Sequence, residues 1–292
     1  MLNLSRNEKV FLGVIYVLLL GVTLAFLLPF IIVLSTSFIS EAEFARRGGY
    51  VLFPEGIDFT AYDILFRRSR VILNAYGVTA FRVVVGTLLN LAFTVTMAYV
   101  LAQKKLPGRI PLTIFVFITM IFSGGLIPRF LLVDYLGLRN TLWSMIVPIL
   151  VNAWYMLIMR NFFMSLPEEL SEAAIVDGAT APVILLRVVL PLSLPVIATI
   201  GLFYAVHHWN AWFDAAIYID RSELQPLQII LRGLLRSATL EGMEEISFME
   251  KPPPAASLRS ALIIVSTVPV LFIYPFIQRY FVKGIMIGGV KG

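Results

Sequence analysis

The chain has 292 residues, of which 59% are hydrophobic and only 14% are charged. A soluble protein of this size carries about a quarter charged residues, so the composition places the chain among membrane proteins. The absence of cysteine excludes disulfides, thiolate metal ligands and a cysteine nucleophile. The modest net charge of +5 indicates basic loops at a membrane surface rather than a nucleic-acid-binding surface.

Long apolar segments recur along the chain, and they predict an all-α membrane protein with six transmembrane helices. A helix needs about 20 mostly apolar residues to cross the hydrocarbon, and no segment alternates with the two-residue period of a barrel strand. The first segment is too long for the core of a signal peptide, so we expect it to be a retained span. The predicted spans lie near residues 10–38, 75–102, 110–128, 141–160, 189–216 and 260–282.

The links between these segments indicate an orientation. The link 103–109 is short and basic, and short basic loops stay in the cytoplasm. With six spans both termini lie on that side, and so does the link 161–188. The long segments 39–74 and 217–259 then lie on the opposite side of the membrane.

The link 161–188 contains a short helix whose composition favours contact with a protein partner. Pro167 and Pro182 bracket it, and Ser165 and Glu168 have the spacing of a capping box. Its acidic residues suit a helix N-terminus but would be repelled by anionic lipid, which argues against a helix that rests on the headgroups. Small residues would let a partner approach closely, namely Ala173, Ala174, Gly178 and Ala179.

The same link resembles the signature of the membrane subunits of binding-protein-dependent ABC importers. That signature reads Glu-Ala-Ala, three residues, Gly, nine residues, then Ile-x-Leu-Pro. It stands here as Glu172-Ala173-Ala174, Gly178 and Val188-Val189-Leu190-Pro191, with valine in place of the isoleucine. The segments 123–128, 209–215 and 226–228 are also similar to the carbohydrate-transporting branch, including permeases for alginate oligosaccharides.

The resemblance implies a mechanism in which this chain hydrolyses no ATP and has no catalytic residue. Two homologous permease subunits, here expected to be different chains, would pair in the bacterial cytoplasmic (inner) membrane. Two ATPase subunits would bind ATP and Mg, so this chain itself would need no cofactor, and it has no nucleotide-binding loop. An extracytoplasmic solute-binding protein would deliver a sugar or oligosaccharide, an anionic one such as an alginate fragment being one candidate.

The resemblance also assigns residues and regions. The short helix would sit in a cleft of one ATPase and couple its closure to transport. The chain would divide into an N-terminal span and periplasmic segment (1–74), a type I ABC importer core (75–282) and a cytoplasmic tail (283–292). The expected coupling residues are Glu172, Ala173, Ala174, Asp177 and Gly178.

Polar and aromatic residues inside the predicted spans are the candidates for a sugar pathway, because polar groups that face lipid are costly. Two other roles stay open for them: an aromatic belt at the membrane interface and hydrogen bonds between helices. His207 and His208 cannot both face one side of a helix, and without a third ligand we expect no metal site. The candidates are Asn152, Tyr155, His208, Trp209, Asn210 and Asp214.

Arg82 lies near the start of the second predicted span, and three roles stay open for it. It could extend its charge to the membrane surface, pair with an acid such as Asp214, or attract an anionic sugar. The alternative function for the whole chain is an ion-coupled secondary transporter, although such proteins show internal repeats and the sequence has no convincing one.

Overall fold

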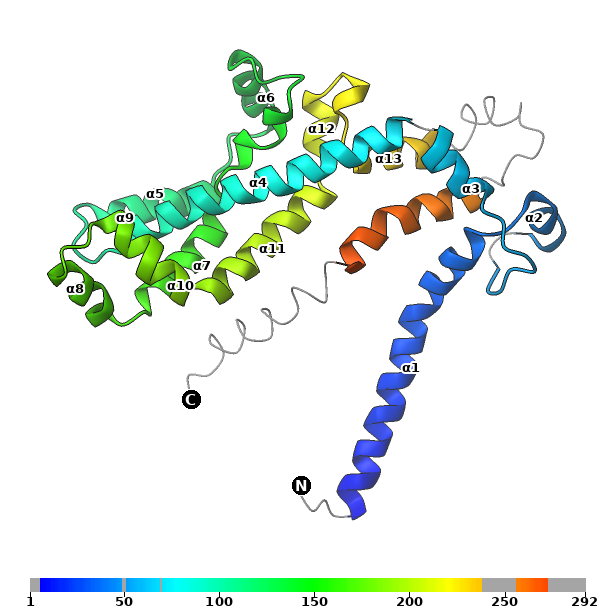
Figure 1. Ribbon diagram of the computed structural model, residues 1–292, viewed down its shortest axis with the longest axis horizontal. Coiled ribbons are helices and arrows are strands. Elements are labelled where there is room, and N and C mark those ends of the chain that lie inside the picture. Colours follow the sequence, from blue (N-terminus) through cyan, green and yellow to red (C-terminus); the bar gives the residue numbers. More distant parts are fainter. Residues whose placement is uncertain (1–5, 49–50, 69, 238–255, 273–292) are drawn as a thin grey trace. The chain divides into compact units, whose positions relative to one another are not determined.

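A computed structural model describes residues 6–48, 51–68, 70–237 and 256–272 (Figure 1). Every regular element within these ranges is helical, in agreement with the predicted all-α class. The chain divides into two compact units, one of residues 1–70 and 231–269 and the other of residues 71–230 and 270–292. The predicted tail, 283–292, lies outside the described residues.

The first unit begins with a long, uninterrupted apolar helix of 31 residues. Helix α1 (Arg6–Thr36) covers the first predicted span, and none of its most apolar window is buried against the chain. Two short helices follow it, α2 (Glu41–Arg47) and α3 (Thr60–Asp63), and α3 continues into the π-helical turn η1 (Ile64–Arg68). A further helix, Ala256–Phe272, covers the described part of the sixth predicted span; residues 273–282 lie outside the described part.

The second unit is organised along α4 (Arg70–Ala102), which covers the second predicted span as one helix of 33 residues (Figure 1). The third predicted span, 110–128, is wrong as a single helix. It is divided into α5 (Arg109–Ile121) and α6 (Leu126–Tyr135), which are bent by 111°. The break covers residues 122–125, and Gly125 at its end has a φ of 87°, in a region that glycine adopts without strain.

The fourth predicted span is also interrupted. It begins with two 3-10 turns, η2 (Leu142–Met145) and η3 (Val147–Ile149), and continues as α7 (Ala153–Met164) after a bend of 50°. Pro148 lies in η3 and has no N–H to donate to a preceding turn. Asn152 then starts α7, because its Oδ1 accepts the N–H of Tyr155 at 3.2 Å.

The fifth predicted span, 189–216, is broken twice rather than continuous. An 86° bend at Ser193 separates the segment 181–192 from α11 (Leu194–Asn210), and α11 ends before Ala211. Prolines at 191 and 195 flank the first break and remove two helical donors there. The remaining elements are α8 (Glu168–Val176), α9 (Ala181–Ile184), η4 (Leu185–Val189), α10 (Leu190–Leu192), α12 (Phe213–Tyr218), η5 (Ser222–Leu224) and α13 (Leu227–Ser237).

The described residues therefore contain two helices, α1 and α4, that are long and apolar enough to cross a membrane alone. They contain up to five spans if each bent pair is one crossing. The predicted number of six stays a prediction. In the second unit the core lies between α4, α7 and α11, where Ala98, Met156, Met159 and Ile200 are buried.

Candidate functional site: the coupling helix and the helix breaks

Helix α8 carries the predicted coupling residues, and its start differs from the prediction. The expected capping box is wrong: the Ser165 hydroxyl donates to the Phe162 carbonyl at 2.7 Å and closes the end of α7 instead. Pro167 occupies the N-cap position of α8 with an extended backbone and makes no side-chain cap. Glu168 and Glu169 in the first turn still stabilise the helix, because the N-terminal end of its dipole attracts negative charge.

The end of α8 is fixed by its backbone. Gly178 has a φ of 78°, and its N–H donates to the Ile175 carbonyl at 2.9 Å. The N–H of Ala179 donates to the Ala174 carbonyl, also at 2.9 Å, which completes a Schellman motif. Ala174 and Ala179 both pack on the core of the second unit. This end of α8 is therefore attached to the bundle rather than free.

Most of the α8 surface is exposed within the single chain. Glu172, Ala173, Asp177 and Gly178 are exposed, whereas Ala174 is half-buried. Apolar side chains are exposed beside them, including Ile175 at 60% and Val176 at 87%. Acidic, small and apolar side chains on one short helix suit docking into a groove on another protein. The coupling role of these residues stays a prediction.

A stripe of buried polar positions runs along one face of α4. Its members are spaced three or four residues apart, which places them on the same side of a helix. The side chains of Thr79, Arg82, Asn90 and Thr94 are all fully buried. We call these four residues, together with the buried Gly86 between them, the α4 stripe: Thr79, Arg82, Gly86, Asn90 and Thr94.

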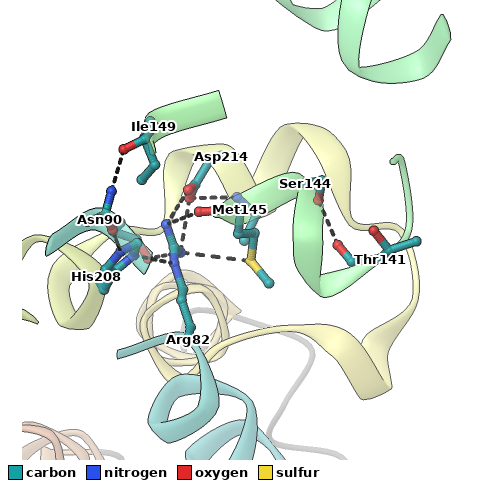
Figure 2. A network of polar contacts seen from close by, with 10 residues as sticks. Arg82, Asn90, Thr141, Ser144, Met145, Ile149, His208 and Asp214 are labelled. Atoms are coloured by element: carbon teal, nitrogen blue, oxygen red, sulfur yellow. Dashed lines mark hydrogen bonds and ion pairs between the residues drawn. The ribbon is translucent and has the colours of Figure 1, made fainter. Parts of the chain in front are cut away.

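Arg82 pairs with Asp214, so that one of its three open roles is confirmed (Figure 2). Its Nη1 lies 3.2 Å from Asp214 Oδ1, and its Nη2 bonds the other carboxylate oxygen. Nη1 also donates to the Ala211 carbonyl at 3.2 Å, and Nη2 donates to the Met145 carbonyl at 3.4 Å. The guanidinium thus connects α4 to α12 and to the 3-10 turn η2.

His208 and Asn90 extend this network (Figure 2). Arg82 Nε donates to His208 Nδ1 at 3.4 Å, so the proton of the imidazole resides on Nε2, which lies 2.7 Å from Asn90 Oδ1. The Asn90 amide nitrogen donates to the carbonyls of Ile149 and Leu150 at 2.6 and 2.9 Å. His208 is fully buried in this network, whereas His207 is exposed.

The other predicted pathway residues lie close to the helix breaks. The Tyr204 hydroxyl lies 2.8 Å from Thr94 Oγ1 and accepts the N–H of Asn152 at 3.0 Å. The ring of Tyr155 meets that of Tyr204 edge-on, with centroids 5.0 Å apart. Trp209 is half-buried near Tyr76, and Asn210 is exposed at the end of α11.

The structure thus separates the candidates into two groups. Asn152 is the N-cap of α7 and Tyr155 lies in its first turn, whereas Trp209, Asn210 and Asp214 flank the break between α11 and α12. The prediction did not single out Thr79, whose Oγ1 accepts the N–H of Leu227 at 2.8 Å. The spacing of polar residues along α4 is the signal that would have found it. Within the described ranges, no three His, Asp or Glu side chains come close enough to hold a metal ion.

Comparison with known proteins identifies the family. The sequence profile described as "Binding-protein-dependent transport system inner membrane component" matches residues 95–287. Protein LplC of Bacillus subtilis (strain 168) is 42% identical over 93% of this chain and 92% of its own length. The polygalacturonan/rhamnogalacturonan transport system permease protein YtcP of the same organism is 40% identical over 98% of this chain and 100% of its own length.

A solved structure is similar over almost the same extent. The crystal structure of a bacterial ABC transporter involved in the import of the acidic polysaccharide alginate contains a chain with a TM-score of 0.88 and 32% identity. The match covers 96% of this chain and 100% of that chain. The family predicted from the Glu-Ala-Ala signature is confirmed: this chain belongs to the inner membrane components of binding-protein-dependent transport systems.

Proposed function

We propose that this chain is the permease subunit of an ATP-driven importer that carries oligosaccharides across the bacterial cytoplasmic membrane. Family membership supports the transport role and the dependence on a solute-binding protein. The observation that carries the energy coupling is the exposed helix α8, which presents Glu172 and Ala173 outward and is attached to the bundle at Gly178. A helix of this kind transmits displacement by a docked partner to the elements that follow it.

The proposed cycle places ATP and Mg in two partner ATPase subunits. Glu172 would face basic groups of an ATPase cleft, and Asp177 and Gly178 would shape the end of the docked helix. Movement of α8 would pass through α9, η4 and α10 to α11, because these elements follow α8 directly in the chain. The ion-coupled alternative lacks support from the family, whose members depend on binding proteins.

The proposed arrangement in the membrane has six spans with both termini in the cytoplasm. It comprises the N-terminal span and periplasmic segment (1–74), the core (75–282) and the tail (283–292). A second, different permease chain would complete the pathway. The exposed apolar surface of α1, including Phe11, Tyr16 and Phe26, would then lie against lipid or that partner.

We propose acidic oligosaccharides as the substrate class. The names of two similar proteins support it, one a polygalacturonan/rhamnogalacturonan permease and the other part of an importer of the acidic polysaccharide alginate. The candidate contact residues are Asn152, Tyr155, Trp209 and Asn210, which supply hydrogen-bonding groups and aromatic faces near the two breaks.

Uptake into proteoliposomes tests the function. The importer would be purified through a tag on this chain and reconstituted with ATP inside and the cognate binding protein outside. We expect ATP-dependent uptake of labelled oligogalacturonides or alginate oligosaccharides, and slower uptake of neutral oligosaccharides of equal length. Uptake that needs an ion gradient but neither ATP nor binding protein would overturn the proposal. Equal uptake of neutral and acidic sugars would overturn only the substrate class.

A further inference from the structure

We infer that Arg82 and Asn90 are positioning residues of the transport pathway. They hold in place the two helix breaks that carry the candidate sugar-contacting residues, and they do so from a single helix, α4. This inference rests on the proposed function, since it assigns a role within transport. It also replaces the idea that Arg82 attracts an anionic sugar directly.

Each helix break leaves backbone carbonyl groups without helical N–H donors, and Arg82 and Asn90 donate hydrogen bonds to such carbonyls. Where a helix is interrupted, carbonyl groups lose their helical donors, and within a membrane no water replaces them at low cost. Arg82 donates to the carbonyl of Ala211, in the break between α11 and α12, and to the carbonyl of Met145, at the end of η2. Asn90 donates to the carbonyls of Ile149 and Leu150, directly before α7.

Two of these carbonyls lie close in the chain to predicted contact residues. Ala211 directly follows Trp209 and Asn210, and Leu150 lies two residues before Asn152. Hydrogen bonds to these carbonyls therefore fix the backbone direction at each break, and with it the orientation of the nearby contact residues. Because Arg82 and Asn90 share one α-helix, the two groups are positioned against a common support (Figure 2).

The network also connects the two breaks with each other. His208 accepts from Arg82 and donates to Asn90, so its imidazole lies between the two positioning residues. The carboxylate of Asp214 belongs to the first turn of α12 and accepts the N–H of Ala215 at 2.9 Å. Displacement of α12 would therefore pull on Arg82 and, through His208, on Asn90.

The Arg82 side chain is not available to a passing substrate in this structure. It is 0% exposed, and all three guanidinium nitrogens have hydrogen-bond partners. Arginine suits such a task because its planar fork can serve several acceptors at once, whereas lysine presents a single point charge. Burial, full hydrogen bonding and contact with both the α11–α12 break and the turn η2 together indicate positioning rather than direct binding.

Paired variants separate positioning from a purely structural role. Removing one partner of a buried ion pair leaves an unpaired charge, whereas replacing both by apolar residues of similar volume is often tolerated. We would therefore compare the double variant Arg82→Met/Asp214→Leu with Arg82→Lys and with Asn90→Leu. The control is Thr96→Val, which changes an exposed hydroxyl on the same helix that bonds only to its own backbone.

The readout is the amount of sugar imported per ATP hydrolysed by equal amounts of assembled importer, alongside the thermal midpoint of the complex. For the double variant we expect an assembled, stable complex in which this ratio falls about tenfold, within the usual range of coupling between sites. The ratio in Arg82→Lys should lie between those of the double variant and the wild type. Asn90→Leu should lower the ratio, and Thr96→Val should leave it unchanged. A normal ratio in the assembled double variant would overturn the inference.

The two proposals fail differently. If the wild type imports no saccharide under ATP, the proposed function is wrong whatever the variants do. If the wild type and Thr96→Val import sugar and the double variant does so with the same ratio, only the positioning role is wrong. If the double variant fails to assemble, the ratio in Arg82→Lys decides, and a wild-type value there overturns the inference.

Discussion

The imidazole of His208, on α11, lies directly against Gly86 of α4. A Cβ atom at position 86 would come within 2.5 Å of His208 Nε2 and 2.8 Å of its Cε1. The ring cannot move away cheaply, because Arg82 and Asn90 bond both of its nitrogens. The close approach of the two helices therefore requires a residue without a side chain at position 86.

Gly86→Ala should destabilise the protein despite the better helix propensity of alanine. We expect a loss of about 2 kcal/mol, since overpacking a buried contact typically costs 1–3 kcal/mol. The matched control is Gly77→Ala on the same helix, where an added Cβ meets nothing within 4 Å. That control should be neutral or slightly stabilising. Thermal unfolding of the detergent-purified complex measures both, and equal midpoints would contradict the packing described here.

The effect of substitutions at Gly178 should depend on the positive backbone φ of this residue rather than on the room available for a side chain. An added Cβ there meets nothing within 4 Å, but the φ of +78° is unfavourable for other residues. Asparagine tolerates this region better than alanine, and a β-branched residue tolerates it least. We expect binding-protein-stimulated ATP hydrolysis to be highest in Gly178→Asn, lower in Gly178→Ala and lowest in Gly178→Val. A series that follows side-chain volume alone, with alanine above asparagine, would argue against the Schellman motif.

The loop after α1 should depend on a buried carboxylate. Glu43 is 3% exposed, and its Oε1 accepts both Arg47 Nη1 and the N–H of Glu55 at 2.9 Å. Glu43→Ala should cost about 2 kcal/mol locally, because two charge-assisted hydrogen bonds are lost and the Glu55 N–H is left without its acceptor. Amide exchange at Glu55 should accelerate in this variant and stay unchanged in Glu41→Ala, an exposed residue on the same helix. Unchanged exchange in Glu43→Ala would refute the role.

The sequence predicted the helical class, the first two spans and the family, because each depends on local or repeated signals. The apolar runs at α1 and α4 are continuous, and the Glu-Ala-Ala signature occupies one short segment. The helix breaks were not predicted, although Ser193 and Gly125 mark them. Hydrophobicity continues across these positions, so an apolar run alone cannot distinguish a straight span from two bent helices.

The α4 stripe shows a similar limit. Arg82 and Asp214 are far apart in the sequence, and their pairing was one of three open roles for Arg82. What decides between those roles is the backbone at Ala211 and Met145, whose carbonyls complete the hydrogen bonding of the guanidinium. The capping box at Ser165 failed for a local reason, because that hydroxyl is used by the helix before it. The coupling and pathway roles themselves stay predictions.

The central claim is that α8 couples ATP hydrolysis in partner subunits to transport, and Glu172→Lys tests it most directly. The measurement is ATP hydrolysis by the reconstituted importer with and without the loaded binding protein. Glu223→Lys is the charge-matched control, an exposed acid in η5 outside α8. We expect Glu172→Lys to insert normally, with stimulation of ATP hydrolysis reduced about tenfold, which is within the usual range of coupling between sites. Glu223→Lys should retain the stimulation. Full stimulation in Glu172→Lys would contradict the claim.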